Sequence, residues 1–427
     1  MRIELLPKDE RPAHRCFSAW FGEGGFSLLL GGQALSVLGD FFGIAAQSVL
    51  VYRLTGSKVA MGTLWLCHFL PMVLFRLVSG PLLDRLDRRR LLMAAEWTRV
   101  AVFAAPALLY FTGLLRVWHL FGFALITGAA EAVFFPVLMA LVPDLVPEQR
   151  LAQANALIEG SRNVVSLVGP ALGAAFVQLW GPGPALLVDA CSFAASAVSV
   201  QLLRPPIRQP AHAGGEKPFL KRLAEGYRFF RVREELLWLA GALAVVNAAQ
   251  AATFAQFLPY ATEQLGTSVA GMGMLESAIA LGALLGTFAA GLCGEIRWRS
   301  LSLLGSLVVS GLALMAMGLT DRFAVALLLA AGFGASGPFF NIVYMTLYQR
   351  LVPGHLRARV FALRMVFATS AMPLGSFLGG VVAEAWGLRA LFLLAGLVSA
   401  LSAGVVYVHP SLRRIDGDLE VATPFSG

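Results

Sequence analysis

Two acidic residues stand near the middle of long apolar segments, where an ionised side chain is costly. Asp40 lies within the apolar residues 26–52, and Glu131 lies within the apolar residues 117–142. If both segments cross a bilayer, each mid-membrane carboxylate costs about 2.5–3.5 kcal/mol and needs a chemical reason. Binding a proton or recognising a cation would supply one, and a satisfied hydrogen bond between helices is the alternative. We predict proton binding, with Asp40 as the first candidate and Glu131 as the second.

The segments that carry these acids belong to a strongly apolar chain. Its 427 residues are 58% hydrophobic and 14% charged, whereas a soluble protein carries about 25% charged residues. The mean hydropathy is +0.73. A helix needs about 20 residues to cross the hydrocarbon core, and the apolar residues form twelve blocks of about that length. The sequence therefore predicts an all-α membrane protein with twelve transmembrane helices.

The placement of the basic residues predicts the orientation of these helices. With both termini in the cytoplasm, most of the 33 lysines and arginines fall on the cytoplasmic side. The predicted location is therefore the cytoplasmic (inner) membrane, with several crossings. A net charge of +8 on a soluble protein would indicate a nucleic-acid partner, but here it reflects topology, and no such partner is expected.

Other charged residues within the blocks are expected to have structural roles. Glu96 and Arg99 are spaced i,i+3 near a cytoplasmic helix end, as are Glu159 and Arg162, so each pair can neutralise itself. The four arginines within the blocks all lie nearer the cytoplasm, so none is expected at the depth of Asp40; they are Arg76, Arg99, Arg162 and Arg364.

The expected surroundings of three more polar residues follow from their positions in the blocks. Asp189 is expected near an outer helix end, where water reaches it, and Glu276 lies one to two turns into the eighth helix. His68 in the second helix is expected to pack or to make a hydrogen bond rather than to relay protons.

The two halves of the chain resemble each other. Aligning residues 145–200 with residues 351–406 without a gap matches a Leu-Val-Pro run, a Trp-Gly pair and several glycines. Parallel six-helix repeats of this kind are a transporter architecture. The predicted division is an N-terminal six-helix half (1–203), a cytoplasmic linker with an amphipathic helix (204–235) and a C-terminal six-helix half (236–427).

One cytoplasmic loop carries a recognisable signature. Residues 80–90 read GPLLDRLDRRR, which resembles the major facilitator loop pattern G-x-x-x-D-R-x-x-R-R. The glycine permits two helices to approach closely, and the acid and the arginines can form ion pairs or cap a helix N-terminus. A basic cluster that only fixes topology is the alternative, but it requires neither the glycine nor the acid. The predicted gating residues are Gly80, Asp84, Arg85, Arg88 and Arg89.

A glycine–proline element lies in the fifth helix. Gly169, Pro170 and Gly173 resemble the core of the G-P-x-x-G-G element of drug–proton antiporters, although Val165 and Ala156 replace the glycines of the longer pattern upstream. A proline kink with small residues for close helix packing explains the element equally well. Both interpretations stay open.

Three further stretches resemble one branch of the major facilitator superfamily, which includes enterobactin exporters and macrolide or multidrug efflux proteins. They are residues 33–40 (QALSVLGD), 151–157 (LAQANAL) and 349–363 (QRLVPGHLRARVFAL). The resemblance implies the major facilitator fold, alternating access, and a central cavity lined by helices one, four, seven and ten. Helices seven and ten carry the aromatic and amide candidates for the cavity wall, for which ordinary helix packing is the alternative. These candidates are Asn247, Gln250, Phe254, Phe340, Asn341 and Tyr344.

Together these features predict a secondary active transporter rather than an enzyme. The sequence contains no P-loop and no hydrolase motif. The expected activity is proton-coupled export of a bulky amphipathic compound such as a drug, a macrolide or a siderophore. The alternatives are a lipid or lysophospholipid transporter, and a ligand sensor with a transporter fold. We expect a monomer in the lipid bilayer with no cofactor. No metal site is expected either, because the four cysteines are scattered.

Overall fold

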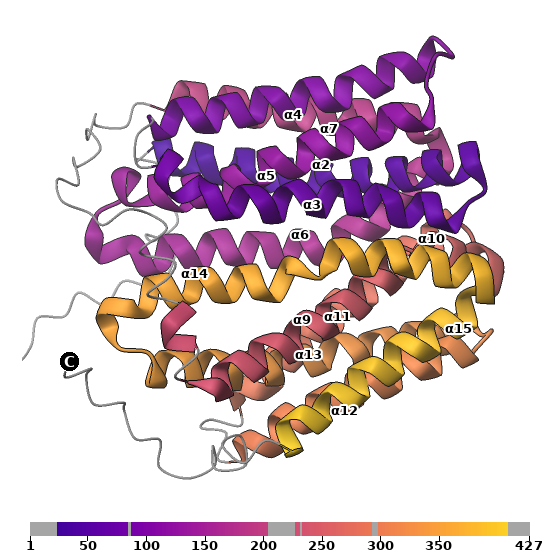
Figure 1. Ribbon diagram of the computed structural model, residues 1–427. Helices are drawn as coiled ribbons and strands as arrows, with labels where there is room; N and C mark the ends of the chain where they lie inside the picture. Colours follow the sequence, from indigo (N-terminus) through magenta and orange to yellow (C-terminus); the bar gives the residue numbers. More distant parts are fainter. Residues whose placement is uncertain (1–23, 84–86, 204–226, 231–232, 293–297, 409–427) are drawn as a thin grey trace, which may run out of the picture.

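The computed structural model is a bundle of long helices that lie roughly side by side (Figure 1). It describes residues 24–83, 87–203, 227–230, 233–292 and 298–408. The helices before the linker are α2 (Gly24–Thr55), α3 (Lys58–Leu83), α4 (Arg88–Phe111), α5 (Val117–Leu145), α6 (Leu151–Trp180) and α7 (Pro182–Leu202). The elements after it are α9 (Glu234–Phe254), α10 (Phe257–Pro259), the π-helix η2 (Tyr260–Gln264), α11 (Val269–Leu292), α12 (Arg299–Leu319), α13 (Phe323–Leu351), α14 (Gly354–Ser370) and α15 (Met372–Val408).

These helices confirm the predicted multi-pass membrane protein. The described residues contain eleven segments that are long and apolar enough to cross a bilayer. The last segment, Arg359–Gly404, has 46 residues, about twice the length of one crossing. Gly387 interrupts it with a non-helical backbone (φ 86°, ψ 167°), so that α15 turns back there. The predicted twelve crossings are therefore accounted for.

A second glycine turns the chain in the same way in the first half. Gly181, between α6 and α7, has φ 87° and ψ 169°. The sequence repeat aligns it with Gly387, so the two halves turn at equivalent positions with the same backbone conformation. Glycine is required because a side chain disfavours a positive φ. Most of the predicted linker, residues 204–226, lies outside the described residues, while residues 227–230 are helical.

The glycines of the antiporter-like element pack two helices together. A Cβ on Gly173 of α6 would lie 2.6 Å from the Phe41 carbonyl oxygen of α2. The repeat-related Gly379 of α15 approaches α9 in the same way, since its Cβ would lie 2.6 Å from Ala252 Cα. The element therefore has a packing role in both halves, which is the structural interpretation left open by the sequence.

The two halves pack tightly at one end of the bundle, here called the closed end. It contains the α2–α3 turn (56–57), the α6–α7 turn (181), residues 255–268 and the turn at 387. A Cβ on Gly62 of α3 would overlap the Ser376 carbonyl oxygen of α15. At the opposite end, here called the linker end, α7 ends and α9 begins. The ribbons of α9 and α12 slope away from α2 and α6 toward the linker end (Figure 1).

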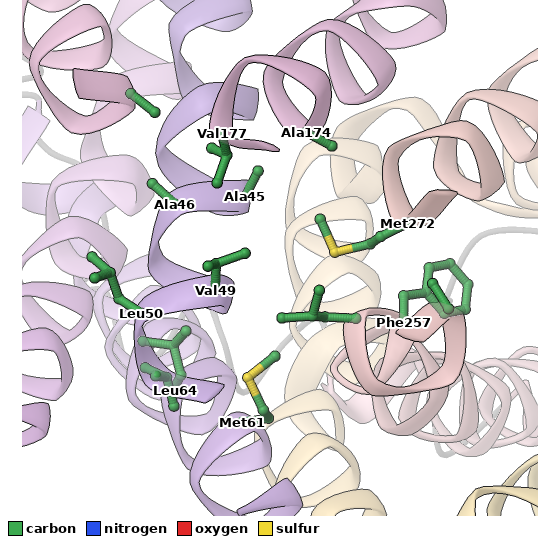
Figure 2. Close-up of a cluster of buried hydrophobic side chains, with 14 of the residues drawn as sticks. Ala45, Ala46, Val49, Leu50, Met61, Leu64, Ala174, Val177, Phe257 and Met272 are labelled. Carbon is green, nitrogen blue, oxygen red and sulfur yellow. The ribbon is translucent and has the colours of Figure 1, made fainter. Parts of the chain in front are cut away.

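Buried apolar side chains from both halves fill the closed end. Figure 2 shows Val49 of α2 and Met61 of α3 opposite Met272 of α11 and Phe257 of α10 from the other half, with Ala174 of α6 in the same cluster. All five side chains are at most 3% exposed. This cluster seals the bundle between the cavity described below and the turns of the closed end.

Candidate functional site

A cavity of about 780 Å³ lies between the two halves. Its wall is formed by residues of α2, α3, α4, α5 and α6 in the first half and of α9, α10, α11, α13 and α15 in the second half. Drug-sized ligands occupy cavities of about 300–1,000 Å³ with mostly apolar walls. The aromatic residues of this wall come from both halves. They are Phe41, Trp65, Phe69, Phe103, Phe254, Phe257 and Phe333.

The predicted proton-binding residue Asp40 is on this wall, but it is paired with an arginine. Arg99 Nη2 of α4 lies 3.3 Å from Asp40 Oδ1 of α2. The guanidinium also lies over the rings of Phe193 and Phe134, at 4.3 Å and 5.0 Å from their centroids. The expectation that no arginine reaches the depth of Asp40 is therefore wrong. Arg99 is about three turns inside α4, so its long side chain reaches the middle of the bundle.

The second candidate, Glu131 of α5, is paired with a histidine. His68 Nε2 of α3 lies 3.1 Å from Glu131 Oε2, and both residues line the cavity. The His68 ring meets Trp65 edge-on, with centroids 5.7 Å apart. A glutamate and a histidine in contact at a cavity wall can bind and pass on a proton. His68 therefore makes the expected hydrogen bond, at a position where a relay role is also chemically possible.

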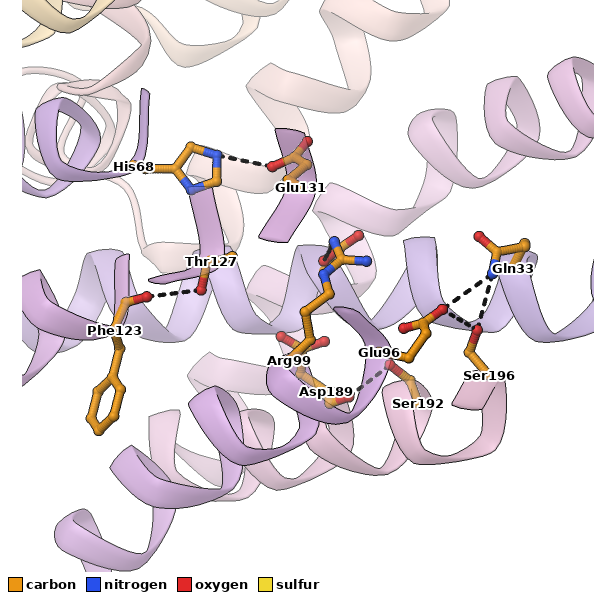
Figure 3. A network of polar contacts seen from close by, with 11 residues as sticks. Gln33, His68, Glu96, Arg99, Phe123, Thr127, Glu131, Asp189, Ser192 and Ser196 are labelled. Carbon is orange, nitrogen blue, oxygen red and sulfur yellow. Dashed lines mark hydrogen bonds and ion pairs between the residues drawn. The ribbon is translucent and has the colours of Figure 1, made fainter. Parts of the chain in front are cut away.

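The predicted neutralising pairs within α4 and α6 are not formed. Glu96 accepts hydrogen bonds from Gln33 and Ser196 instead of an ion pair from Arg99, with Oε1 at 3.2 Å and 2.5 Å from the two donors (Figure 3). Arg162 lies over the Phe135 ring of α5 at 4.8 Å from its centroid. Tertiary partners have replaced the i,i+3 partners in both helices, because isolated-helix pairs contribute only about 0.2–0.5 kcal/mol.

Two carboxylates are placed differently from the sequence-based expectation. Asp189 of α7 is 0% exposed and lies in the interior near Arg99, so the expected access to water at an outer end is wrong. Glu276 of α11 lines the cavity from the second half. Among the residues that the structure describes, none forms an ion pair or a hydrogen bond with its side chain. Its distance from the helix start was visible in the sequence, but the face of α11 that meets the cavity was not.

The cavity candidates on the seventh and tenth helices divide into two groups. Asn247, Gln250 and Phe254 of α9 lie on the wall. Phe340 and Tyr344 of α13 are buried in an apolar cluster with Phe229, Phe230 and Tyr348. Asn341 is exposed on α13. These three α13 residues are not on the wall of this cavity, because they lie beyond it toward the linker end, and their predicted contact with substrate stays a prediction. Only Phe333, two turns earlier, reaches the wall from α13.

The loop signature is described only in part. Asp84 and Arg85 lie outside the described residues, Gly80 is in the last turn of α3, and Arg88 begins α4. Arg89 donates hydrogen bonds to the Val200 and Gln201 carbonyl oxygens at the C-terminus of α7. A cation is favourable there because of the unpaired carbonyls and the helix dipole. Arg89 thus joins α4 to α7, while its predicted gating role stays a prediction.

Comparison with known proteins agrees with this architecture. A family described as "transmembrane secretion effector" matches residues 18–427. Macrolide efflux protein A of Streptococcus pyogenes is 25% identical over 402 residues, covering 92% of this chain and 97% of that protein. The multidrug efflux pump Tap of Mycolicibacterium fortuitum is 27% identical over 391 residues, covering 88% and 94%.

Solved transporter structures share the fold at low sequence identity. A mutant of the nucleoside transporter NupG superposes with a TM-score of 0.71 at 14% identity, covering 91% of this chain and 99% of that one. A bacterial homologue of the human lysosomal transporter Spinster gives a TM-score of 0.72 at 14% identity, covering 95% and 98%. These neighbours are transporters and not enzymes. The chain therefore belongs to the transmembrane secretion effector family of major facilitator transporters.

Proposed function

We propose that this transporter exports a bulky amphipathic compound in exchange for protons, by alternating access. The observation that carries the proposal is the cavity between the halves, which combines an aromatic wall with acids from both sides. Asp40 and Glu131 are the carboxylates on the first half, and Glu276 is the carboxylate on the second. The macrolide and multidrug efflux relatives support the substrate class. The positive-inside pattern supports placement in the cytoplasmic membrane with both termini inside.

We further propose that the structure is the inward-facing state. In the predicted topology, the closed end faces the outside. Polar contacts there join the halves: Lys58 Nζ lies 2.8 Å from Glu263 Oε2, and Lys58 N donates to Glu384 Oε2 at 2.6 Å. Glu384 thus caps the N-terminus of α3, where a carboxylate is favoured. Burial, and secondarily the charge of Glu384, raise the pKa of Glu263 above its ordinary value.

Removing the Glu384 cap should favour opening of the closed end. A charged hydrogen bond contributes about 1.5–3 kcal/mol, so its loss shifts a two-state equilibrium about tenfold or more. We expect Glu384→Ala to add a longer-distance population between spin labels at Leu54 and Leu319, which are exposed on opposite halves of the closed end. The native cysteines are replaced first. Asp321→Ala is the control, because Asp321 pairs with Arg389 within the second half. An unchanged distance distribution in Glu384→Ala would rule out the proposed latch.

Glu276 supplies a site for a substrate cation. It faces a cavity whose aromatic rings can hold the apolar body of a ligand, and a positive group next to this unpartnered carboxylate favours its ionised form, with which it pairs. We expect Glu276→Gln to weaken binding of the permanently cationic dye ethidium about tenfold. Binding of the neutral dye Nile red should change less than twofold. Glu148→Gln, an exposed glutamate outside the cavity, is the matched control. Equal effects on both dyes would show that Glu276 does not recognise charge.

The proposed function is tested by driving transport with a pH gradient. Purified protein is reconstituted into liposomes, and uptake of erythromycin, ethidium and a siderophore is measured with and without an imposed gradient. We expect uptake of at least one compound to require the gradient and to stop when a protonophore collapses it. If every transported compound is taken up at the same rate with and without the gradient, proton coupling is contradicted.

A further inference from the structure

Asp189 is a buried carboxylate for which the proposed function so far has no role. Its side chain is 0% exposed, and no described residue donates a hydrogen bond to either carboxylate oxygen. The Ser192 hydroxyl donates to the backbone carbonyl of Asp189 instead. An ionised carboxylate without donors is strongly unfavourable in such an apolar interior. The side chain is therefore most stable when it carries a proton.

Asp189 lies directly against the turn of α2 that carries Asp40. A Cβ on Gly43 would overlap the Asp189 carboxylate, and a Cβ on Gly39 would lie 2.9 Å from Asp189 Oδ1. Asp40 lies between these two glycines in the sequence. The absence of side chains at both positions allows an acid from α7 to reach the backbone of α2 beside the acid on the cavity wall.

A single guanidinium serves both acids. Arg99 pairs with Asp40 through Nη2, while its Nε has no hydrogen-bond partner among the described residues. The charge of Arg99 also acts on Asp189, and Figure 3 shows the two side chains next to each other. The flanking rings of Phe193 and Phe134 confine the guanidinium. Arg99 is therefore the cation next to both acids.

The other charged groups around Asp189 have different partners or lie farther away. Glu96, which faces it from α4, accepts hydrogen bonds from Gln33 and Ser196 at Oε1, while its Oε2 has no partner among the described residues. Arg162 of α6 is farther from the turn at Gly181 than Asp189 of α7 is. At a rise of 1.5 Å per residue, the two positions differ by about 16 Å along the helix axes. Glu131, which acts on Asp40 from α5, is paired with His68. Taken without Glu96, the two aspartates and Arg99 form a local unit that is neutral when it holds one proton.

We propose that Asp40 and Asp189 share one proton, which resides on whichever acid is not paired with Arg99. In this structure Arg99 pairs with Asp40, which leaves the proton on Asp189. Transfer breaks the O–H bond at Asp189 and forms one at Asp40, directly or through a water, while Arg99 turns to Asp189. Release of the proton from Asp40 into the cavity then leaves one net negative charge, which a cationic substrate can offset. This inference deepens the proton-coupled export proposed above, because it names the second carboxylate of the coupling site.

Infrared spectroscopy tests the shared proton without a transport assay. Wild-type protein grown with ¹³C-labelled aspartate should show, at a pH near 7, the carbonyl stretch of a protonated aspartic acid, although an aspartate in water is ionised there. Asp40→Asn and Asp189→Asn should each remove this band, because the remaining acid then pairs with Arg99 and ionises. Asp321→Asn, which changes an exposed aspartate that pairs with Arg389, should leave the band intact.

The outcomes separate a shared proton from two independent acids. Loss of the band in only one variant, no loss in either, or no labelled band in the wild type would each overturn the inference. Asp189→Glu keeps an acid at this position, so the band of the protonated acid should move to the frequency of an unlabelled glutamic acid. This variant replaces Asp189→Asn in the test if Asp189→Asn does not fold. A shared-proton band together with uptake that ignores pH would overturn only the proposed function. Uptake that requires the pH gradient, without the shared-proton band, would overturn only the shared proton.

Discussion

Replacing Asp40 with asparagine should abolish uptake driven by a pH gradient while preserving the fold. The amide of the new side chain cannot bind or release a proton, but it fills the same space on the cavity wall. Arg99 keeps Asp189 as an acidic neighbour, so the buried guanidinium is not left unpaired. We expect pH-driven uptake to fall to the level of empty liposomes, and ethidium binding to change by less than about threefold.

Two controls make this result specific to the proton. Asp321→Asn removes an acid outside the cavity and should transport normally. Glu131→Gln removes the second candidate, and a smaller loss is expected because His68 remains at the cavity wall. Full pH-driven uptake by both Asp40→Asn and Glu131→Gln would show that neither residue carries the proton.

Replacing Arg99 with methionine should produce the largest loss of stability. Arg99 is 5% exposed and is the cation among Asp40, Glu96 and Asp189. Removing one member of a buried ion pair costs about 3–5 kcal/mol, since the partner charge is left uncompensated. We expect Arg99→Met to lower the free energy of unfolding in detergent by about 3 kcal/mol. Adding Asp40→Asn should restore part of this loss, because one uncompensated acid is then removed.

A matched arginine on the same cavity wall is the control for Arg99. Arg162 contacts the Phe135 ring, an interaction that contributes about 0.5–1 kcal/mol at exposed sites. Arg162→Met should therefore be destabilised by about 1 kcal/mol or less. If Arg99→Met is no less stable than Arg162→Met, Arg99 does not hold the buried acids together.

The sequence predicted the elements of this protein better than their contacts. Apolar block length and charge placement located the helices, because every crossing must bury its backbone in hydrocarbon. Repeat-related Gly181 and Gly387 marked equivalent turns, which adopt the same positive φ in the structure. The positions of Asp40 and Asn247 on the cavity wall were also predicted, because the family resemblance indicates which helices line the cavity.

The interactions of the charged residues could not be predicted because they depend on helix rotation and side-chain reach. Position in an apolar block gives the depth of a Cα, but an arginine side chain spans more than a helical turn. Arg99 therefore pairs with Asp40 on α2 and not with Glu96, which is on the same helix as Arg99. Asp189 faces inward rather than toward water, and Tyr344 packs beyond the cavity. Only the packing of neighbouring helices decides these outcomes.

Export and proton movement are expected to be coupled through the cavity between the halves. The most direct test imposes a gradient of a transported compound across proteoliposomes at equal pH on both sides and records the internal pH with a trapped dye. We predict proton movement opposite to the substrate, with none in Asp40→Asn. Substrate movement with no change of internal pH in the wild type would contradict this coupling.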